Sequence, residues 1–343
     1  MLAQRMLAAA SAATVEKYLA VSHSLTPFVT VYRQSGADFN KLADPSSLPA
    51  GNATGVVFSA DGVYMAVAHS TTPFVTIYKR SGDTFTKLAN PAILPASNAR
   101  SIALSSDGTY LVVGNNVTPF ITIYKRSGDV FTKLSDPASL PGGTVQGVAF
   151  SADGVYLSIA TTVTPFVIIY KRSGDTFTKL ADPSTLPAGA GYMPSWSTDG
   201  VYLAVAHGVS PFITIYKRAG DTFTKLANPG TLPANISVAA AFSPDNVYLA
   251  VAHQTTPFVT IYKRSGDTFT KLANPATLPG NNGLSAAFSA DGLYLAVGDA
   301  GTARISIYSR SGDTFTKLAN PAVLPANDGS GVAFYPRAFE GIV

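Results

Sequence analysis

The chain has 343 residues, a formal net charge of +4, 46% apolar residues and 13% charged residues. This composition argues against a disordered chain, and no apolar run reaches the roughly 18 residues that a membrane-spanning helix needs. Because the chain has no cysteine, disulfides, thiolate metal ligands and a cysteine nucleophile are excluded.

The first 14 residues, MLAQRMLAAASAAT, precede the regular part of the sequence. Arg5, a short apolar stretch and then small residues follow the order of a secretory signal peptide, although the apolar part is short and rich in alanine. The alternative is a short helix or tail. We therefore expect residues 1–14 to form an N-terminal extension and residues 15–343 to form a single domain.

A proline recurs every 46 residues through most of the chain, at Pro27, Pro73, Pro119, Pro165, Pro211 and Pro257. One further step lands on Ala303, within the degenerate copy TARISIYSR. The sequence thus contains seven repeats without an insertion or deletion. A repeat of about 40–50 residues with several short β-rich segments is typical of a β-propeller.

Within each repeat, four segments are rich in β-branched and aromatic residues and are separated by turn residues. In the second repeat these candidate strands, named A to D, are GVVF (55–58), VYMAVAH (63–69), FVTIYKR (74–80) and TFTKL (84–88). Asp61-Gly62 predicts a tight A–B turn, and Gly82 predicts a C–D turn with a positive φ angle. A proline at position 73 is tolerated because it opens strand C.

The order of the strands predicts how the ring closes. Strands B to D occur seven times, beginning with EKYLAVSH (16–23), whereas the seventh strand A is GVAF (331–334) near the C-terminus. We therefore predict an all-β, seven-bladed propeller with four antiparallel strands per blade, in which the C-terminal strand joins the N-terminal blade. Such closure removes the exposed sheet edges that promote aggregation.

The segments FSADGVYMAVA (58–68) and FSADGLYLAVG (288–298) resemble the A–B hairpin of WD40-like propellers. The Trp-Asp dipeptide of true WD40 repeats is missing, because the single tryptophan, Trp196, is followed by Ser197. The near-identical blades built on PFVTIYKRSGDTFTKLA resemble propeller repeats of phage and prophage virion proteins. This last resemblance implies a virion component, although fold likeness alone does not give function.

The two faces of the predicted disc differ in how much they vary between repeats. The A–B and C–D turns lie on one face and are nearly constant, with basic residues such as Lys79 and Arg80 beside acids such as Asp83. This pattern predicts solvated ion pairs worth under ~1 kcal/mol each. It argues against a nucleic-acid platform, which needs an excess of basic charge.

The B–C and D–A loops lie on the opposite face and vary from repeat to repeat. Loops on a rigid scaffold commonly carry binding residues, whereas free drift of loop sequences is the alternative explanation. Candidate contacts with a ligand or partner are Asn52, His69, Asn98, Arg100, Gln146, Tyr192, His207, His253 and Arg304.

The sequence shows no motif for catalysis, for a metal or for a cofactor. All four histidines fall in one column at the end of strand B, and equivalent positions on different blades splay apart, so we expect no metal site. On the variable face the acids are few, namely Asp299, Asp328 and the Asp44, Asp136 and Asp182 that open D–A loops. No convergent pair of catalytic groups is predicted from these positions.

These observations predict a non-catalytic interaction protein. The resemblance to phage and prophage propeller repeats implies that it is located in a virion, as a tail, collar, decoration or host-attachment protein. Its expected partners are other virion or host-surface proteins or a glycan, within a larger symmetric assembly and without nucleic acid or a membrane span. Two alternative hypotheses remain open. One is a propeller hydrolase of lactonase or sialidase type, and the other is a bacterial peptide-binding scaffold.

Overall fold

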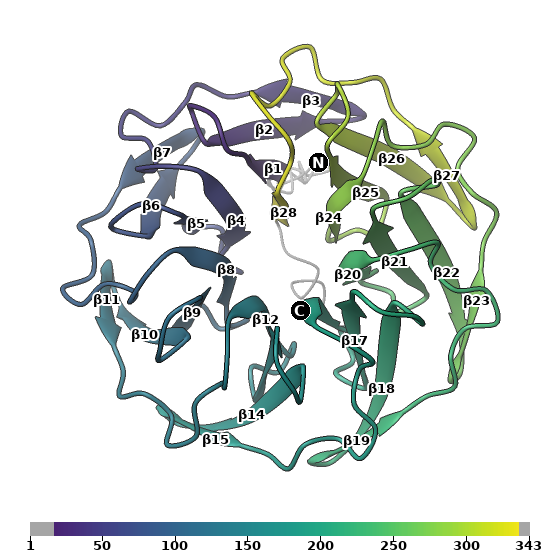
Figure 1. Cartoon of the computed structure of the whole chain (residues 1–343). Helices are drawn as coiled ribbons and strands as arrows, with labels where there is room; N and C mark the ends of the chain where they lie inside the picture. Colours follow the sequence, from purple (N-terminus) through teal and green to yellow (C-terminus); the bar gives the residue numbers. More distant parts are fainter. Residues whose placement is uncertain (1–16, 336–343) are drawn as a thin grey trace, which may run out of the picture.

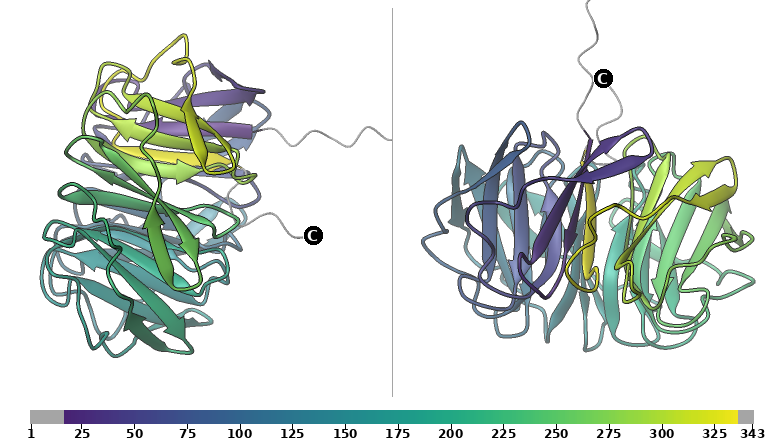
Figure 2. Two further views of the ribbon diagram at one scale, coloured as in Figure 1. Left: turned by 90° about the vertical axis from the view of Figure 1, so that its right-hand side faces the viewer. Right: turned by 90° about the horizontal axis from the view of Figure 1, so that it is seen from above.

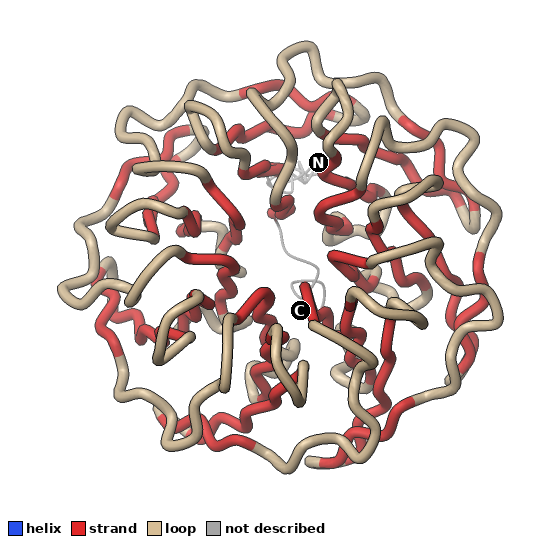
Figure 3. Tube along the Cα trace, viewed as in Figure 1, coloured by secondary structure: helices blue, strands red, loops and turns tan. Residues whose placement is uncertain are grey.

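The structure, a computed structural model, describes residues 17–335 of the chain. It is a ring of seven four-stranded antiparallel sheets, and Figure 1 views the ring from the face that carries the B–C and D–A loops. Within these residues all regular elements are strands, joined by turns and loops (Figure 3). The predicted extension at residues 1–14 lies outside the described residues.

Each sheet uses its strands in the order A to D from the axis of the ring outward (Figure 1). Strand A of blades 2 to 7 and then of blade 1 is β4 (Ala53–Phe58), β8 (Ala99–Leu104), β12 (Val145–Phe150), β16 (Gly191–Trp196), β20 (Ser237–Phe242), β24 (Gly283–Phe288) and β28 (Gly331–Tyr335). Strand B is, in the same order, β5 (Tyr64–His69), β9 (Tyr110–Asn115), β13 (Tyr156–Thr161), β17 (Tyr202–His207), β21 (Tyr248–His253), β25 (Tyr294–Asp299) and β1 (Lys17–Ser22).

The two outer strands of each blade follow the same pattern. Strand C is β6 (Val75–Ser81), β10 (Ile121–Ser127), β14 (Val167–Ser173), β18 (Ile213–Ala219), β22 (Val259–Ser265), β26 (Ile305–Ser311) and β2 (Val29–Ser35). Strand D is β7 (Thr84–Lys87), β11 (Val130–Lys133), β15 (Thr176–Lys179), β19 (Thr222–Lys225), β23 (Thr268–Lys271), β27 (Thr314–Lys317) and β3 (Asp38–Lys41). The prediction of seven blades with four strands each is confirmed.

Blade 1 is assembled from both ends of the described chain. Strand β28 pairs antiparallel with β1, so that Phe334 lies opposite Leu19 and Tyr335 lies opposite Tyr18. The predicted closure of the ring by the C-terminal strand is therefore confirmed. It leaves Lys17 and Tyr335, the two described ends, on the face of the A–B and C–D turns (Figure 2).

The strand bounds differ from the sequence-based expectation by one or two residues, and the differences in strands C and A have a local backbone cause. Strand C starts one residue later than predicted, because Phe74 adopts a φ of 67° before the extended backbone begins. Strand A starts two residues earlier than predicted, and its register shifts between Ala53 and Gly55, which leaves Thr54 as a bulge residue. Gly82 has a φ of 56°, as predicted for the C–D turn.

The hydrophobic core lies between neighbouring blades. Strands A to C bury residues on both faces of each sheet, and each core cluster joins side chains from two blades, such as Tyr18 of blade 1 with Phe58 and Met65 of blade 2. The large tyrosines of strand C are fully buried, and Tyr78 donates its hydroxyl hydrogen to the carbonyl oxygen of Ser47 at 2.8 Å. A buried tyrosine hydroxyl usually has such a partner.

The face of the A–B and C–D turns carries a ring of ion pairs between blades. Lys79 pairs with Asp129 of the next blade at 2.8 Å, rather than with an acid in its own C–D turn, and both side chains remain nearly half exposed. The same Asp129 accepts a hydrogen bond from Tyr64, whose ring lies beneath the guanidinium of Arg126. The predicted solvated ion pairs are therefore present, but they join neighbouring blades.

In the part of the chain that the structure describes, no helix has the length and apolar character needed to cross a membrane.

Candidate functional site

Three of the predicted contact residues surround one part of the axis on the B–C/D–A face. Arg100, Gln146 and Tyr192 occupy the bulge position of strand A in blades 3, 4 and 5. A bulge re-aims a side chain out of the regular pleat. Arg100 is exposed, whereas Gln146 and Tyr192 are partly buried, and among residues 17–335 no hydrogen bond or ion pair joins the three.

Asn52 and Asn98 are exposed in the D–A loops that precede blades 2 and 3. Both lie on the predicted face, but on separate blades. The structure therefore distributes these two residues around the ring rather than gathering them at one point.

The predicted histidine contacts require a correction. His69, His207 and His253 are fully buried, and in each the Nε2 atom lies 2.9–3.0 Å from the hydroxyl of a strand C threonine, namely Thr76, Thr214 and Thr260. Burial lowers the pKa of each imidazole to about 4, so the rings are neutral near pH 7. They link strand B to strand C and offer no surface that a partner can reach.

Blade 7 departs from the other blades on this face. Asp299 occupies the column that holds histidine, asparagine or threonine elsewhere, and Arg304 occupies the column that holds phenylalanine in the other six blades. Asp328 occupies a column that otherwise holds Asn, Thr, Ala or Ile. Arg304 forms an ion pair with Asp328, and their side chains are 32% and 41% exposed. One basic and two acidic residues are therefore brought together at a single blade.

The backbone holds this group in place. The B–C turn closes through a hydrogen bond from the amide of Asp299 to the carbonyl oxygen of Arg304, while the amide of Gly329 donates to the carbonyl oxygen of Asp299. A Cβ atom at Gly329 would lie 2.5 Å from the carbonyl oxygen of Arg304, so only glycine allows this approach. The D–A loop that carries Asp328 is thus packed directly on the B–C loop that carries Arg304.

Asp299 supports the site from below the surface. Its side chain is fully buried, and it accepts hydrogen bonds from the amide of Gly301 at 2.8 Å and from the hydroxyl of Ser306 at 2.9 Å. Burial raises the pKa of Asp299, and the two hydrogen bonds act in the opposite direction. Asp299 therefore fixes the B–C loop, while Arg304 and Asp328 are the groups that solvent and a small ligand can reach.

From the sequence, these three residues were identified separately and not as one group. Arg304 was a candidate contact, and Asp299 and Asp328 were noted as rare acids on the variable face. An alignment of the seven repeats connects them, because each of the three differs from the residues at the equivalent positions of the other repeats, and all three belong to the last repeat. Among residues 17–335, no group of three or more histidine, aspartate or glutamate side chains has the arrangement of a metal site.

No model of a known protein family matches the chain, and no curated protein matches it. Solved structures do match its fold. A protein from Bacteroides fragilis named as a candidate 6-phosphogluconolactonase is 16% identical with a TM-score of 0.76, over 94% of this chain and 99% of that one. The periplasmic gluconolactonase PpgL of Pseudomonas aeruginosa is also 16% identical, with a TM-score of 0.70, over 93% and 99% of the two chains.

A second candidate 6-phosphogluconolactonase, from Bacteroides uniformis, is 14% identical with a TM-score of 0.75, over 93% of this chain and 99% of that one. At such identities the likeness shows the fold, and the activity in each name belongs to that protein. The prediction that this protein is not an enzyme is nevertheless contradicted, because the structures that it resembles carry lactonase names. The resemblance to virion proteins finds no match among these neighbours. A virion location and protein or glycan partners stay predictions.

Proposed function

We propose that the protein is a hydrolase of lactonase type whose reaction centre is the Arg304–Asp328 pair. The observation that carries the proposal is the replacement of a repeated phenylalanine by Arg304 and its pairing with Asp328 at a partly exposed position. The lactonase names of the structural neighbours favour the same class of reaction. A propeller hydrolase of lactonase or sialidase type was one of the two alternative hypotheses from the sequence.

The two side chains supply the groups that lactone hydrolysis needs. Asp328 binds Arg304 through Oδ1, and a carboxylate has a second oxygen that can accept a proton from water. The activated water attacks the lactone carbonyl carbon, and negative charge develops on the carbonyl oxygen. A guanidinium has five N–H donors, so Arg304 can hold Asp328 and still stabilise this oxyanion.

The reaction ends with cleavage of the ring C–O bond. The ring oxygen leaves as an alkoxide and takes the proton that Asp328 received from water, which gives a hydroxy acid. Water is the only co-reactant, and Asp328 returns to its ionised form. Asp299 has no contact with the reacting atoms in this scheme and acts as a positioning residue for the loop of Arg304.

The test is turnover of glucono-δ-lactone and γ-butyrolactone by the purified full chain and by two variants. Asp328→Asn should lower kcat/KM by about 100-fold or more, the usual contribution of a general base. Arg304→Phe, which restores the residue of the other six blades, should cause a similar loss without loss of fold.

A matched control is Asp182→Asn in another D–A loop. Asp182 pairs with Lys179 at 2.9 Å, and the two side chains are 27% and 38% exposed, close to the values for the Arg304–Asp328 pair. This variant should retain wild-type turnover. Absence of turnover on both lactones, or equal activity of Asp328→Asn and wild type, would show that the assignment is wrong.

A further inference from the structure

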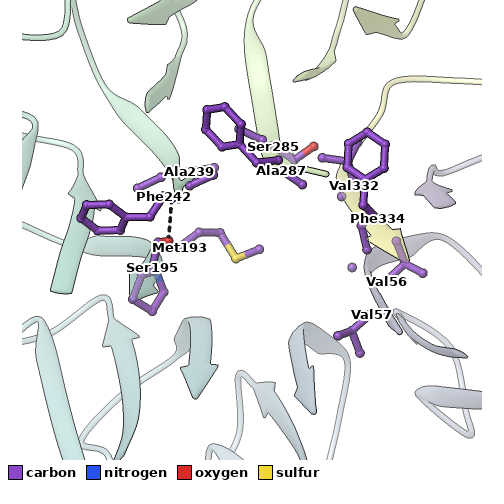
Figure 4. A pocket seen from close by; sticks show the side chains of 18 of the residues that line it. Val56, Val57, Met193, Ser195, Ala239, Phe242, Ser285, Ala287, Val332 and Phe334 are labelled. Atoms are coloured by element: carbon purple, nitrogen blue, oxygen red, sulfur yellow. Dashed lines mark hydrogen bonds between the residues drawn. The ribbon is translucent and has the colours of Figure 1, made fainter. Parts of the chain in front are cut away.

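A cavity of about 220 Å³ lies along the axis of the ring and is lined by strands A. Aliphatic and small side chains make up most of its wall, including Val56, Ile102, Ala240, Ala286 and Val332. Figure 4 shows this cavity from close by, with the side chain of Met193 extending toward its centre. No charged side chain belongs to this wall among the described residues.

The few polar side chains in the wall are already hydrogen-bonded to the protein. Ser195 accepts a hydrogen bond from the amide of Phe242 at 3.2 Å, as Figure 4 shows, and Thr198 donates to the carbonyl oxygen of Pro244 at 2.8 Å. The indole N–H of Trp196 donates to Ser158 at 3.0 Å. A phosphate or carboxylate placed here would lose its hydration without gaining a charged partner, which is strongly unfavourable.

The remaining polar groups of the wall are neutral. Each strand A pairs only with strand B of its own blade, so its second edge has no partner strand and faces the axis. The amides and carbonyls of such an edge can bind water or a neutral polar group. The cavity is therefore suited to an uncharged, mainly apolar occupant.

The wall of the cavity and the Arg304–Asp328 pair are linked through the D–A loop that leads from Asp328 into β28. Gly331, in the wall, follows Asp328 by three residues, a span of at most about 10 Å in an extended chain. Ser285, also in the wall, donates a hydrogen bond to the carbonyl oxygen of Gly329 at 3.0 Å. The nearest wall residue in the sequence, Gly331, is thus within about 10 Å of Asp328, a distance that a substituent on a ring bound at the pair can span.

We infer that the axial cavity receives the hydrocarbon chain of the substrate, so that the substrates are lactones with an alkyl or acyl substituent rather than phosphorylated sugar lactones. This inference rests on the proposed function and specifies its substrate class. An apolar cavity of about 150 Å³ takes up the six carbons of benzene, so a cavity of this size accommodates on the order of eight carbons.

The test compares γ-lactones whose side chains lengthen from none in γ-butyrolactone to twelve carbons in γ-hexadecalactone, together with glucono-δ-lactone and 6-phosphoglucono-δ-lactone. Burial of one methylene increases binding about fourfold. We expect kcat/KM to rise by about this factor for each methylene until the cavity is filled, and then to level off. The phosphorylated lactone should be the poorest substrate.

Two variants of Met193 test whether the hydrocarbon chain of the substrate lies in the cavity. Met193→Ala enlarges the cavity and should move the plateau to longer side chains, whereas Met193→Trp should move it to shorter ones. The rate of each variant on each lactone is divided by its own rate on γ-butyrolactone, which has no side chain, so that any change at the reaction centre cancels. The substitutions lie in the wall and leave Arg304 and Asp328 intact.

The possible outcomes separate the two proposals. Turnover that is independent of chain length, a preference for the phosphorylated lactone, or an unchanged plateau in both Met193 variants would overturn this inference and leave the proposed function standing. Absence of turnover on every lactone would overturn the proposed function, and this inference with it.

Discussion

Six of the seven contacts between neighbouring blades follow one pattern, and the contact between blades 7 and 1 does not. In the regular contacts a strand B tyrosine and a strand C base bind one aspartate of the next blade, as Tyr64 and Lys79 bind Asp129. At the contact between blades 7 and 1, the positions of the base and the aspartate hold Ser309 and Ala37. Both charges are missing together, so neither is left without its partner.

The same contact differs in two further ways. Gln34 replaces the arginine that covers the strand B tyrosine elsewhere, and an ion pair between Lys17 and Asp291 at 2.5 Å has no counterpart in the regular blades. On the opposite face, blade 7 carries the Arg304–Asp328 pair beside blade 1. The departures from repetition therefore concentrate where the two ends of the chain meet, which is also where we place the reaction centre.

The largest expected effect on the free energy of unfolding comes from truncating a side chain in the strand that closes the ring. Phe334 in β28 and Phe288 in β24 occupy equivalent positions and are 4% and 5% exposed. Truncation of either residue to alanine should lower the free energy of unfolding by about 3–5 kcal/mol, the usual result for a buried phenylalanine. Denaturant unfolding of Phe334→Ala and Phe288→Ala measures both. A much smaller loss for Phe334→Ala would mean that β28 is not packed as the regular strands are.

The second prediction concerns the pH dependence of stability. Its sign in the blades that carry a buried histidine is opposite to its sign in blade 7, which carries Asp299. Burial lowers the pKa of His69, His207 and His253 from 6.5 to about 4, so the unfolded chain binds protons that the folded chain does not. Stability is therefore complete above pH 6.5 and falls as the pH drops toward 4, by up to about 1.4 kcal/mol per pH unit for each histidine. The pKa of Asp299 is raised, so its contribution is lost as the pH rises.

Unfolding measured at several pH values between 7 and 4.5 tests this point. Replacing the three histidines by asparagine, the residue that the chain itself uses at Asn115, should flatten the loss of stability on the acid side. Thr161→Asn in the same column is the matched control, because it changes no titrating group. If the triple variant kept the wild-type pH dependence, other groups would be responsible for it.

Much of the fold could be predicted because the sequence contains seven copies of one repeat. The interval of 46 residues and the displaced strand GVAF were enough to predict the blades and the pairing of Phe334 with β1. The local backbone conformation was harder to predict. Nothing in the sequence indicates that Phe74 adopts a positive φ, since aromatic residues rarely do.

The contacts between neighbouring blades could not be predicted from the spacing of residues within a repeat. Lys79 lies four residues before Asp83, but it pairs with Asp129 because strand C of one blade faces the C–D turn of the next. The pairing of Arg304 with Asp328 likewise depends on a D–A loop crossing to the next blade. The burial of His69 could not be predicted from the sequence either, because a residue at the junction of a strand and a loop can face inward or outward.

The smallest effect should come from restoring the regular contact between blades 7 and 1. The triple variant Gln34→Arg, Ala37→Asp and Ser309→Lys rebuilds the arrangement that surrounds Asp129 in the regular blades. Exposed ion pairs contribute about 0.2–1 kcal/mol, and a guanidinium above a tyrosine ring about 0.5–1 kcal/mol. We therefore expect thermal or denaturant unfolding to show a gain of about 1 kcal/mol, which added salt should reduce.

One double and one single variant distinguish a pairwise effect from three independent ones. Ala37→Asp with Ser309→Lys should retain the ion-pair part of the gain, whereas Ala37→Asp alone should give none, because the new carboxylate then lacks its lysine. Turnover should not change in any of these variants, since they lie on the face opposite to Arg304 and Asp328. A loss of turnover in the triple variant would mean that the two faces of this blade contact are coupled, and that the neutral residues at positions 34, 37 and 309 serve the reaction centre rather than only the closure of the ring.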